Sequence, residues 1–260
     1  MNVALRVRIA CTLIALPALS ALSTLSAHAQ HYTLRLLGQE SLPPKWILRH
    51  GKPDGECPSI LAALERVEPR LHFTGGADFR SIPVIENALD TGRIDCACAL
   101  LDTPQRRQIA VASSQSLYIV KHKVAVAAGD NVEVRTLDDL VRLKAPIATS
   151  RGAGYADQLR ALGLEVDDSN GDNLINMKKI IAGHGRFFYM NQMTLEWIAR
   201  ENRLEDKIRI LPAVLKEEPV YFWVSKQADP NAARLVEQAL QKIRTSGELA
   251  RINQRWLAER

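Results

Sequence analysis

The sequence has few aromatic residues and no strong excess of either charge. Phe, Trp and Tyr make up 5% of the 260 residues, which argues against a surface on which the bases of single-stranded nucleic acid stack. The formal net charge is +5, and it falls to about +3 when Arg6 and Arg8 are removed with the segment described next. A charge this small and this scattered does not indicate a protein that binds nucleic acid.

Long apolar runs are also scarce, and the only one begins near the N-terminus. Arg6 and Arg8 precede an apolar run from Ile9 to Leu22, and Ala27-His28-Ala29 follows it as a small-x-small sequence. This order is typical of a secretory signal peptide, and the run is shorter than the roughly 20 residues that cross a bilayer. We predict that residues 1–29 are a signal peptide and that the mature protein is exported to a bacterial periplasm, not embedded in a membrane. An uncleaved anchor helix is the alternative.

Cysteine is rare as well, with four residues in the chain. Cys11 lies in the predicted signal peptide. In an oxidising compartment Cys57, Cys96 and Cys98 are expected to form one disulfide and leave one thiol. Cys96 and Cys98 point to the same face of a predicted strand and do not readily pair with each other. We favour Cys57 with Cys98; pairing with Cys96, or three free thiols, is the alternative. No metal-ligand spacing occurs nearby, and we predict no metal or cofactor.

The rest of the chain alternates between strand and helix patterns. Its composition, 47% hydrophobic and 24% charged, is that of a globular protein. Strand patterns occur at 32–37, 71–73, 94–101, 124–128, 147–149, 186–190 and 220–224, and helical patterns at 58–67, 82–89, 137–143, 156–162, 173–182, 194–202, 231–245 and 248–257. This alternation predicts an α/β architecture with largely parallel sheets.

Five segments of the chain contain motifs that follow one another in a recognisable order. Leu89 to Asp95 contains an L-x-x-G-x-x-D turn, and Thr103-Pro104-Gln105-Arg106 is a T-x-x-R motif. Ser246 to Leu257 contains a terminal G-x-L-x-x-I-x-x-x-W signature. The other two segments are Leu34 to Pro44, a first strand with a Pro-bearing loop, and Gly55 to Leu64, which enters the first helix. In this order the five segments resemble the family 3 extracellular solute-binding proteins, the periplasmic receptors of polar amino acid ABC transporters.

The resemblance implies the type II periplasmic binding protein fold, in which two α/β lobes close over a ligand in a central cleft. Carried over to this chain, it places lobe 1 at 31–119 plus 222–260 and lobe 2 at 124–216. The two hinge strands that cross between the lobes are expected at 118–123 and 217–221. The expected partners are a small-molecule solute and the membrane permease of an ABC transporter, and the protein is expected to act as a monomer.

The resemblance also implies ligand-binding residues. Arg106 is expected to bind a ligand carboxylate, because a guanidinium donates two parallel charge-assisted hydrogen bonds. Thr103 is expected to support it by hydroxyl bonding or by capping the next turn. In the loop before the next helix, Arg151 and Gly152 are expected to hold an anion from lobe 2. Asn191 occupies the position of an Asp that pairs with the ligand ammonium in the family, and an amide cannot neutralise that charge.

The remaining candidates are Glu40 and Trp46. Glu40 is expected either to pair with a ligand amine or to be a solvated loop residue. Trp46 is expected either to line the cleft and pack on the ligand or to pack within lobe 1. The predicted function is capture of a small carboxylate-bearing solute, amino acid-like or organic acid, for an ABC transporter. The alternatives are a periplasmic sensor or accessory protein that acts through a separate partner, and a dehydratase-like enzyme. We predict that the protein is not an enzyme, since Glu40 is the one candidate for a catalytic acid or base.

Overall fold

The computed structural model of the protein describes residues 30–257, and the predicted signal peptide lies outside them. From His31 onward the chain forms one compact unit, and the description below concerns that unit. No helix within residues 30–257 is both long and apolar enough to cross a membrane.

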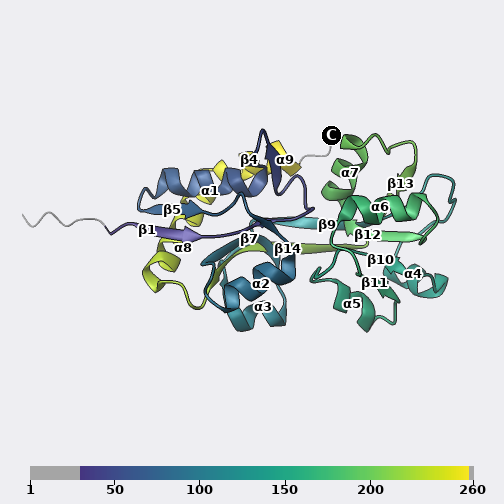
Figure 1. Cartoon of the computed structure of the whole chain (residues 1–260), viewed down its shortest axis with the longest axis horizontal. Coiled ribbons are helices and arrows are strands. Elements are labelled where there is room, and N and C mark those ends of the chain that lie inside the picture. The colour runs from purple at the N-terminus through teal and green to yellow at the C-terminus, as the bar shows by residue number, and fades with distance from the viewer. Residues whose placement is uncertain (1–29, 258–260) are drawn as a thin grey trace, which may run out of the picture. The chain divides into compact units, whose positions relative to one another are not determined.

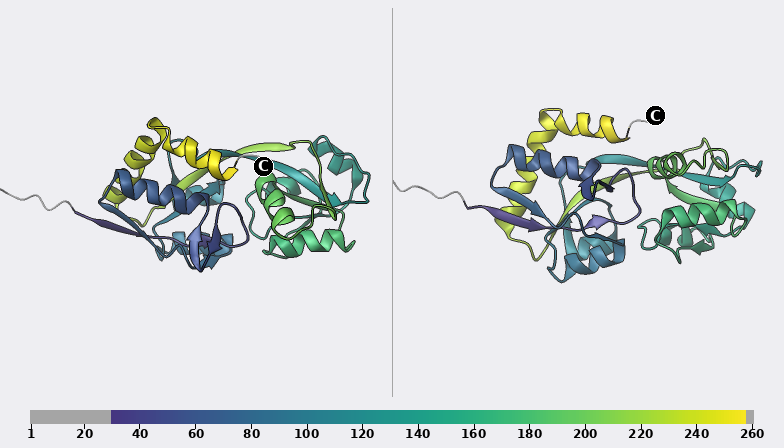
Figure 2. Two further views of the ribbon diagram at one scale, coloured as in Figure 1. Left: turned by 90° about the horizontal axis from the view of Figure 1, so that it is seen from above. Right: turned by 45° about the horizontal axis from the view of Figure 1, so that its top comes forward.

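Two long antiparallel strands, β9 (Tyr118–Ala127) and β14 (Lys216–Ser225), run through the middle of this unit (Figure 1). His122 of β9 lies opposite Lys216 of β14 in their register. Both strands belong to a sheet whose order is β11-β10-β12-β9-β14-β7, with β13 paired to β9 and β8 paired to β14. The views in Figure 2 show further elements grouped at each end of this strand pair.

We call the elements at one end lobe 1. They come from the N-terminal part of the chain and from its last two helices. They are β1 (Tyr32–Arg35), β2 (Gly38–Gln39), β3 (Ile47–Arg49), β4 (Lys52–Asp54), α1 (Glu56–Val67), β5 (Leu71–Thr74), β6 (Phe79–Arg80), α2 (Ile82–Asp90), β7 (Cys96–Leu101), α3 (Pro104–Ile109), β8 (Ala110–Ala112), α8 (Pro230–Thr245) and α9 (Glu248–Leu257).

The elements at the other end form lobe 2, and they lie between β9 and β14 in the sequence. They are α4 (Leu137–Leu143), β10 (Ile147–Ala148), α5 (Ala156–Ala161), β11 (Val166–Asp167), α6 (Asn173–Ile181), β12 (Phe187–Asn191), α7 (Gln192–Glu201) and β13 (Ile208–Ile210). The predicted lobe boundaries, 31–119 plus 222–260 and 124–216, stay a prediction.

The mixed α/β architecture is as predicted, but the expectation of largely parallel sheets is wrong. Parallel pairs are β1 with β5, β2 with β6, and β10 with both β11 and β12. Within residues 30–257, β9 and β14 form only antiparallel pairs. The reason is that these two strands carry the chain from lobe 1 to lobe 2 and back, so they run in opposite directions.

The lobe 1 core forms between α1, α8, α9 and the sheet. On α1 the buried residues include Ile60, Leu61 and Leu64, which recur at helical spacing and therefore share one face. The helix α1 packs against both α8 and α9. Trp256, the last residue of the terminal signature, donates from Nε1 to Oγ of Ser59 on α1 at 2.9 Å. The signature thus fixes α9 to the rest of lobe 1.

Lobe 2 has its own core around β12, whose five residues are all buried. A strand covered on both faces reads as a continuous apolar run, as Phe187 to Met190 does. The helices α6 and α7 begin at the side-chain caps Asp172 and Asn191. Leu42 of the loop after β2, which is 5% exposed, joins this core from lobe 1, and Ile82 and Leu101 of lobe 1 also pack against it.

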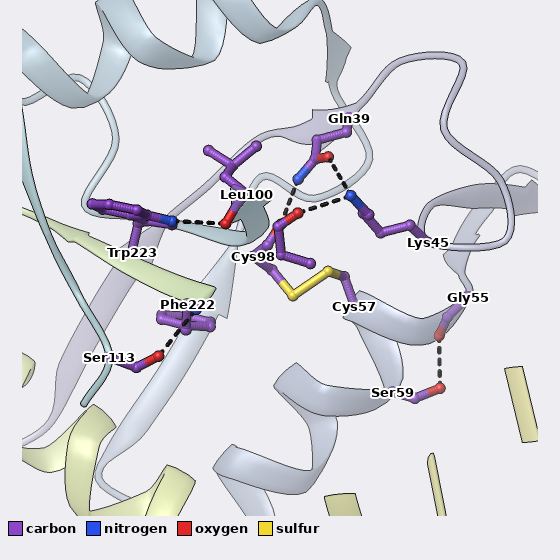
Figure 3. Close-up of a disulfide and its surroundings, with 11 residues drawn as sticks. Gln39, Lys45, Gly55, Cys57, Ser59, Cys98, Leu100, Ser113, Phe222 and Trp223 are labelled. Atoms are coloured by element: carbon purple, nitrogen blue, oxygen red, sulfur yellow. Dashed lines mark hydrogen bonds between the residues drawn. A yellow bond between two sulfur atoms is a disulfide. The ribbon is translucent and has the colours of Figure 1, made fainter. Parts of the chain in front are cut away.

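A disulfide joins Cys57 of α1 to Cys98 of β7, with the two Cα atoms 5.9 Å apart (Figure 3). Cys96 on the same strand is a buried free thiol, and its burial raises the pKa of that thiol. The bond ties the first helix of lobe 1 to the strand that leads into the T-x-x-R segment.

Candidate ligand-binding cleft

A cavity of about 40 Å³ lies beside β9 and β14 and is lined by residues of both lobes. This volume admits only a few water molecules. Its polar lining side chains are Gln39, Lys45, Arg106, His122, Ser150, Tyr155 and Asn191. No lining residue is Asp or Glu, so the charged side chains that reach the cavity are cationic.

Arg106 is buried at the cavity wall and held by three contacts. Its backbone N–H donates to Oγ1 of Thr103 at 3.2 Å, the cap that begins α3. Its Nε donates to Oε1 of Glu86 at 2.8 Å and its Nη1 to the carbonyl of Leu101 at 2.6 Å. Burial lowers the pKa of this 2%-exposed guanidinium and Glu86 opposes the shift, so it remains charged. Within residues 30–257 these contacts leave Nη2 for a ligand.

The glycine-rich loop of lobe 2 closes directly against lobe 1. A Cβ atom at Gly154 would lie 2.9 Å from Cγ2 of Thr103 and 3.3 Å from Nη1 of Arg106. At Gly152, whose φ is +71°, a Cβ atom would lie 2.5 Å from Cδ of Pro83. Side chains at these two positions would hold the lobes apart, so the glycines permit the close approach seen here.

Asn191 lines the cavity and also caps a helix. Its Oδ1 accepts a hydrogen bond from the backbone N–H of Thr194 at 2.9 Å at the start of α7. The amide oxygen is therefore engaged, and the NH₂ group is what this side chain can offer a ligand. At the position where the family resemblance expects an acid, the cleft presents a hydrogen-bond donor.

Of the seven predicted ligand-binding residues, Arg106 and Asn191 line the cavity and five do not. Thr103 and Gly152 are two of these five, and the other three are Glu40, Trp46 and Arg151. Glu40 is exposed in the loop after β2. Trp46 is 2% exposed and packs in the lobe 1 core, where its ring meets that of Phe79 edge-on at 6.1 Å. Arg151 is exposed, and its guanidinium donates to the carbonyl of Ser169 within lobe 2.

Lys45 is a buried cation that the sequence analysis did not identify. Its Nζ donates to the carbonyl of Ala99 at 2.8 Å and to Oε1 of Gln39 at 3.4 Å (Figure 3). Gln39 in turn donates from Nε2 to the carbonyl of Cys98. Burial lowers the pKa of Lys45, with the nearby Glu56 carboxyl opposing that shift. Lys45 therefore reaches the cavity from a position fixed by β7.

Behind Lys45, Glu56 at the start of α1 is fully buried. Burial raises the pKa of its carboxyl, and the neighbouring Tyr118 hydroxyl and Lys45 ammonium both oppose that shift. Burial likewise raises the pKa of Tyr118. Burial thus disfavours the charged forms of both Glu56 and Lys45, and the attraction between their opposite charges offsets only part of that effect.

On the hinge side, His122 of β9 is 1% exposed. Its Nδ1 lies 3.1 Å from Oη of Tyr189 and 3.3 Å from Oε2 of Glu218. Its ring meets that of Tyr155 edge-on, with 4.6 Å between the centroids. Burial lowers the pKa of His122 to about 4, although Glu218 opposes the shift. The imidazole is therefore neutral at neutral pH.

The cavity residues that were not predicted from the sequence lie next to, or within, segments that were. Lys45 immediately precedes Trp46, Tyr155 follows the glycine-rich loop, and His122 lies inside the predicted crossing at 118–123. The loop positions were visible in the sequence. Which side chain of each loop faces the cavity depends on tertiary packing.

Comparison with known proteins identifies the family. The family described as bacterial extracellular solute-binding proteins, family 3, matches residues 34–259. The chain belongs to this family. Comparison with curated protein sequences finds no match.

Solved structures share the fold at low sequence identity. A histidine kinase sensor domain with similarity to periplasmic binding proteins is 21% identical, with a TM-score of 0.74 over 88% of this chain and 97% of its own. A mutant of an arginine-binding protein from T. maritima is 17% identical, with a TM-score of 0.71 over 87% and 96%. A probable amino-acid ABC transporter extracellular-binding protein from Bacillus subtilis is 16% identical, with a TM-score of 0.70 over 88% and 98%. The fold is that of the type II periplasmic binding proteins.

Proposed function

We propose that this protein captures a small carboxylate-bearing solute, amino acid-like or organic acid, and delivers it to the membrane permease of an ABC transporter. The observation that carries the proposal is Arg106, a buried guanidinium with one nitrogen left for a ligand, at a cavity with no acidic lining. A guanidinium in this setting donates charge-assisted hydrogen bonds to a carboxylate. Membership of the solute-binding family supports the same function.

The other residues of the proposed site act around Arg106. Thr103 fixes the start of α3 and with it the direction of Arg106. Gly152 permits lobe 2 to close over the bound solute, and Asn191 donates a hydrogen bond from lobe 2. Closure is a hinge motion of β9 and β14, and the solute favours the closed form because only that form contacts it from both lobes.

In this proposal residues 1–29 direct export and are removed, and the mature protein works in the periplasm as a monomer. The lobes that move are 31–119 plus 222–260 and 124–216. The separate hydrophobic clusters of the two lobes support this division. The transporter permease is the proposed protein partner.

The test is a thermal-shift screen of the refolded, solute-free protein against amino acids, dicarboxylates, hydroxy acids, aromatic acids and polyamines. A solute at a hundredfold excess over its dissociation constant should stabilise the fold by about 2.7 kcal/mol. We expect a carboxylic acid to give this shift and Arg106→Ala to abolish it. Arg107→Ala is the matched control, because that neighbouring guanidinium is exposed and pairs with Asp102.

Two results would contradict the proposal. One is a screen in which no carboxylate stabilises the protein. The other is a shift that survives Arg106→Ala, since the solute would then bind without the residue on which the proposal depends.

A sensor or accessory role is the second candidate, and the shared fold with a histidine kinase sensor domain favours it. It predicts the same solute binding but a different partner. Deleting a neighbouring permease gene should abolish solute-dependent growth for a transport protein and leave the response intact for a sensor. We propose no enzymatic step: Glu40, on which that alternative depended, is exposed and outside the cavity lining.

A further inference from the structure

Both charged side chains that line the cavity, Lys45 and Arg106, are cations, and His122 beside them is neutral at neutral pH. Acidic side chains do lie nearby, but each stands outside the lining and next to a base. Glu86 pairs with Arg106. Glu218 pairs with Lys216 and also lies next to His122. Glu56 lies behind Lys45. The cavity itself therefore offers positive charge without a free carboxylate.

An ammonium group on the solute would bind unfavourably in this cavity. It would lose its hydration and face two cations, and a buried charge without an opposite partner is strongly unfavourable. The two side-chain amide oxygens of the lining are already engaged. Oδ1 of Asn191 accepts from Thr194, and Oε1 of Gln39 accepts from Lys45.

Lys45 is well placed to bind an anion instead. An ammonium has three N–H donors, and that of Lys45 uses two of them to donate to the Ala99 carbonyl and to Oε1 of Gln39. Both of those partners are anchored at β7, next to the disulfide between Cys57 and Cys98 (Figure 3). The remaining donor is held in place before a solute arrives, which lowers the entropic cost of binding.

We infer that the solute is a small carboxylate without an ammonium group, and that Lys45 binds it together with Arg106. This inference rests on the proposed function, and it narrows the solute to hydroxy, oxo or unsubstituted acids. A hydroxyl or oxo group needs no opposite charge in the cavity. Such a group meets donors such as the Asn191 amide.

The first experiment compares acids that differ only in an ammonium or a hydroxyl group. L-malate is titrated against L-aspartate, and L-lactate against L-alanine, by calorimetry on the solute-free protein at pH 7. We expect the hydroxy acid of at least one pair to bind tenfold or more tightly than its amino acid. An amino acid that binds as tightly as its hydroxy partner would overturn the inference and leave the proposed function standing. Binding of none of the four overturns the inference too; if the wide screen also finds no carboxylate, the proposed function falls with it.

The second experiment replaces Lys45 together with Glu56, so that no buried carboxylate is left without an opposite charge. Glu56→Gln alone keeps the lysine but removes a charge that raises its pKa, so the affinities are compared at pH 6, where this variant should bind the acid at least as tightly as the natural protein. Lys45→Met combined with Glu56→Gln should bind it tenfold or more weakly. Lys52→Met is the matched control, because Lys52 is an exposed lysine of the same lobe. Equal affinity in Glu56→Gln and in the double variant, with both folded by circular dichroism, would overturn the role of Lys45.

A pH profile separates binding by Lys45 from mere support of the fold. The groups around its ammonium are Glu56 of α1, Arg106 of α3, and Tyr118 and His122 of β9. Burial lowers the pKa of Lys45 in the free protein, and a bound carboxylate would raise it again. Binding then takes up a proton, so affinity falls as pH rises between about 7 and the ordinary lysine value of about 10.4. We expect this fall in Glu56→Gln and a flatter profile in the double variant; equal slopes would contradict the inference.

Discussion

At the scale of single residues, burial and one neighbour decide the charge of each side chain around the cleft. Arg106 stays charged because Glu86 is within hydrogen-bond distance of its Nε. His122 is as deeply buried, but its nearest acid, Glu218, is already paired with Lys216. Desolvation therefore dominates for His122 and keeps it neutral.

The neutral form of His122 makes stability depend on pH. Its pKa in the folded protein is about 4, whereas an unfolded histidine titrates near about 6.5. The unfolded chain therefore binds this proton first as pH falls, and the free energy of unfolding decreases between about pH 6.5 and pH 4, by up to about 3 kcal/mol. Urea unfolding across this range should show a smaller loss in His122→Gln than in the natural protein. His184→Gln, at an exposed histidine, should keep the full loss, and equal losses in all three would refute the assignment.

The residue scale also shows what the sequence can predict of the site. Arg106 was predicted because Thr103 to Arg106 resembles the family's T-x-x-R motif, and the structure has the Thr103 cap on the same helical turn. Lys45 was missed because its partner, the Ala99 carbonyl, is 54 residues away. Short-range spacing records local geometry, whereas the direction of Lys45 is set by contacts that only the folded chain makes.

At the scale of elements, the helices were easier to predict than the strands. The pattern at 137–143 coincides with α4, and the predicted terminal helices agree with α8 and α9 within one residue. The hairpin of β3 and β4 and the short strands β6, β8, β11 and β13 were not predicted. A strand of two or three residues is too short to display an alternating pattern, and its partner strand defines it.

The disulfide between α1 and β7 gives a prediction at this scale. Cys57 and Cys98 are 41 residues apart in the sequence, and closing a loop of that length should stabilise the fold by about 4 kcal/mol or less. The double variant Cys57→Ser/Cys98→Ser should therefore unfold at lower urea concentration than the natural protein. Cys96→Ala, which removes the buried free thiol, should still lose stability on reduction, while the double variant should not. A natural protein insensitive to reductant would contradict this pairing.

At the scale of the whole molecule, a loop of lobe 1 holds the two lobes together. The carbonyl of Ser41 accepts from Nδ2 of Asn173 at 2.6 Å, and its Oγ accepts from the Asn173 backbone N–H at 2.8 Å. The carbonyl of Pro43 accepts from Oγ1 of Thr194 at 2.7 Å. Between them Leu42 lies in the lobe 2 core. The closed arrangement is thus stabilised by the chain itself before any solute binds.

Leu42→Ala should therefore favour the open form. Removing a buried leucine side chain costs about 2–5 kcal/mol, and here the cost falls on the closed arrangement because Leu42 packs across the lobes. Small-angle X-ray scattering of the solute-free variant should give a larger radius of gyration than the natural protein. Leu48→Ala, at a leucine that is 54% exposed, should leave it unchanged. An unchanged value for Leu42→Ala would show that this loop does not govern closure.

The central claim is that Arg106 binds a solute carboxylate in the cleft, and one titration tests it most directly. The acid that gives the largest thermal shift is titrated calorimetrically into the natural protein and into Arg106→Lys. Lysine keeps the charge but lacks the planar array of donors, so we predict at least tenfold weaker binding in the variant, equivalent to about 1.4 kcal/mol. Equal affinity in the two proteins would contradict the account.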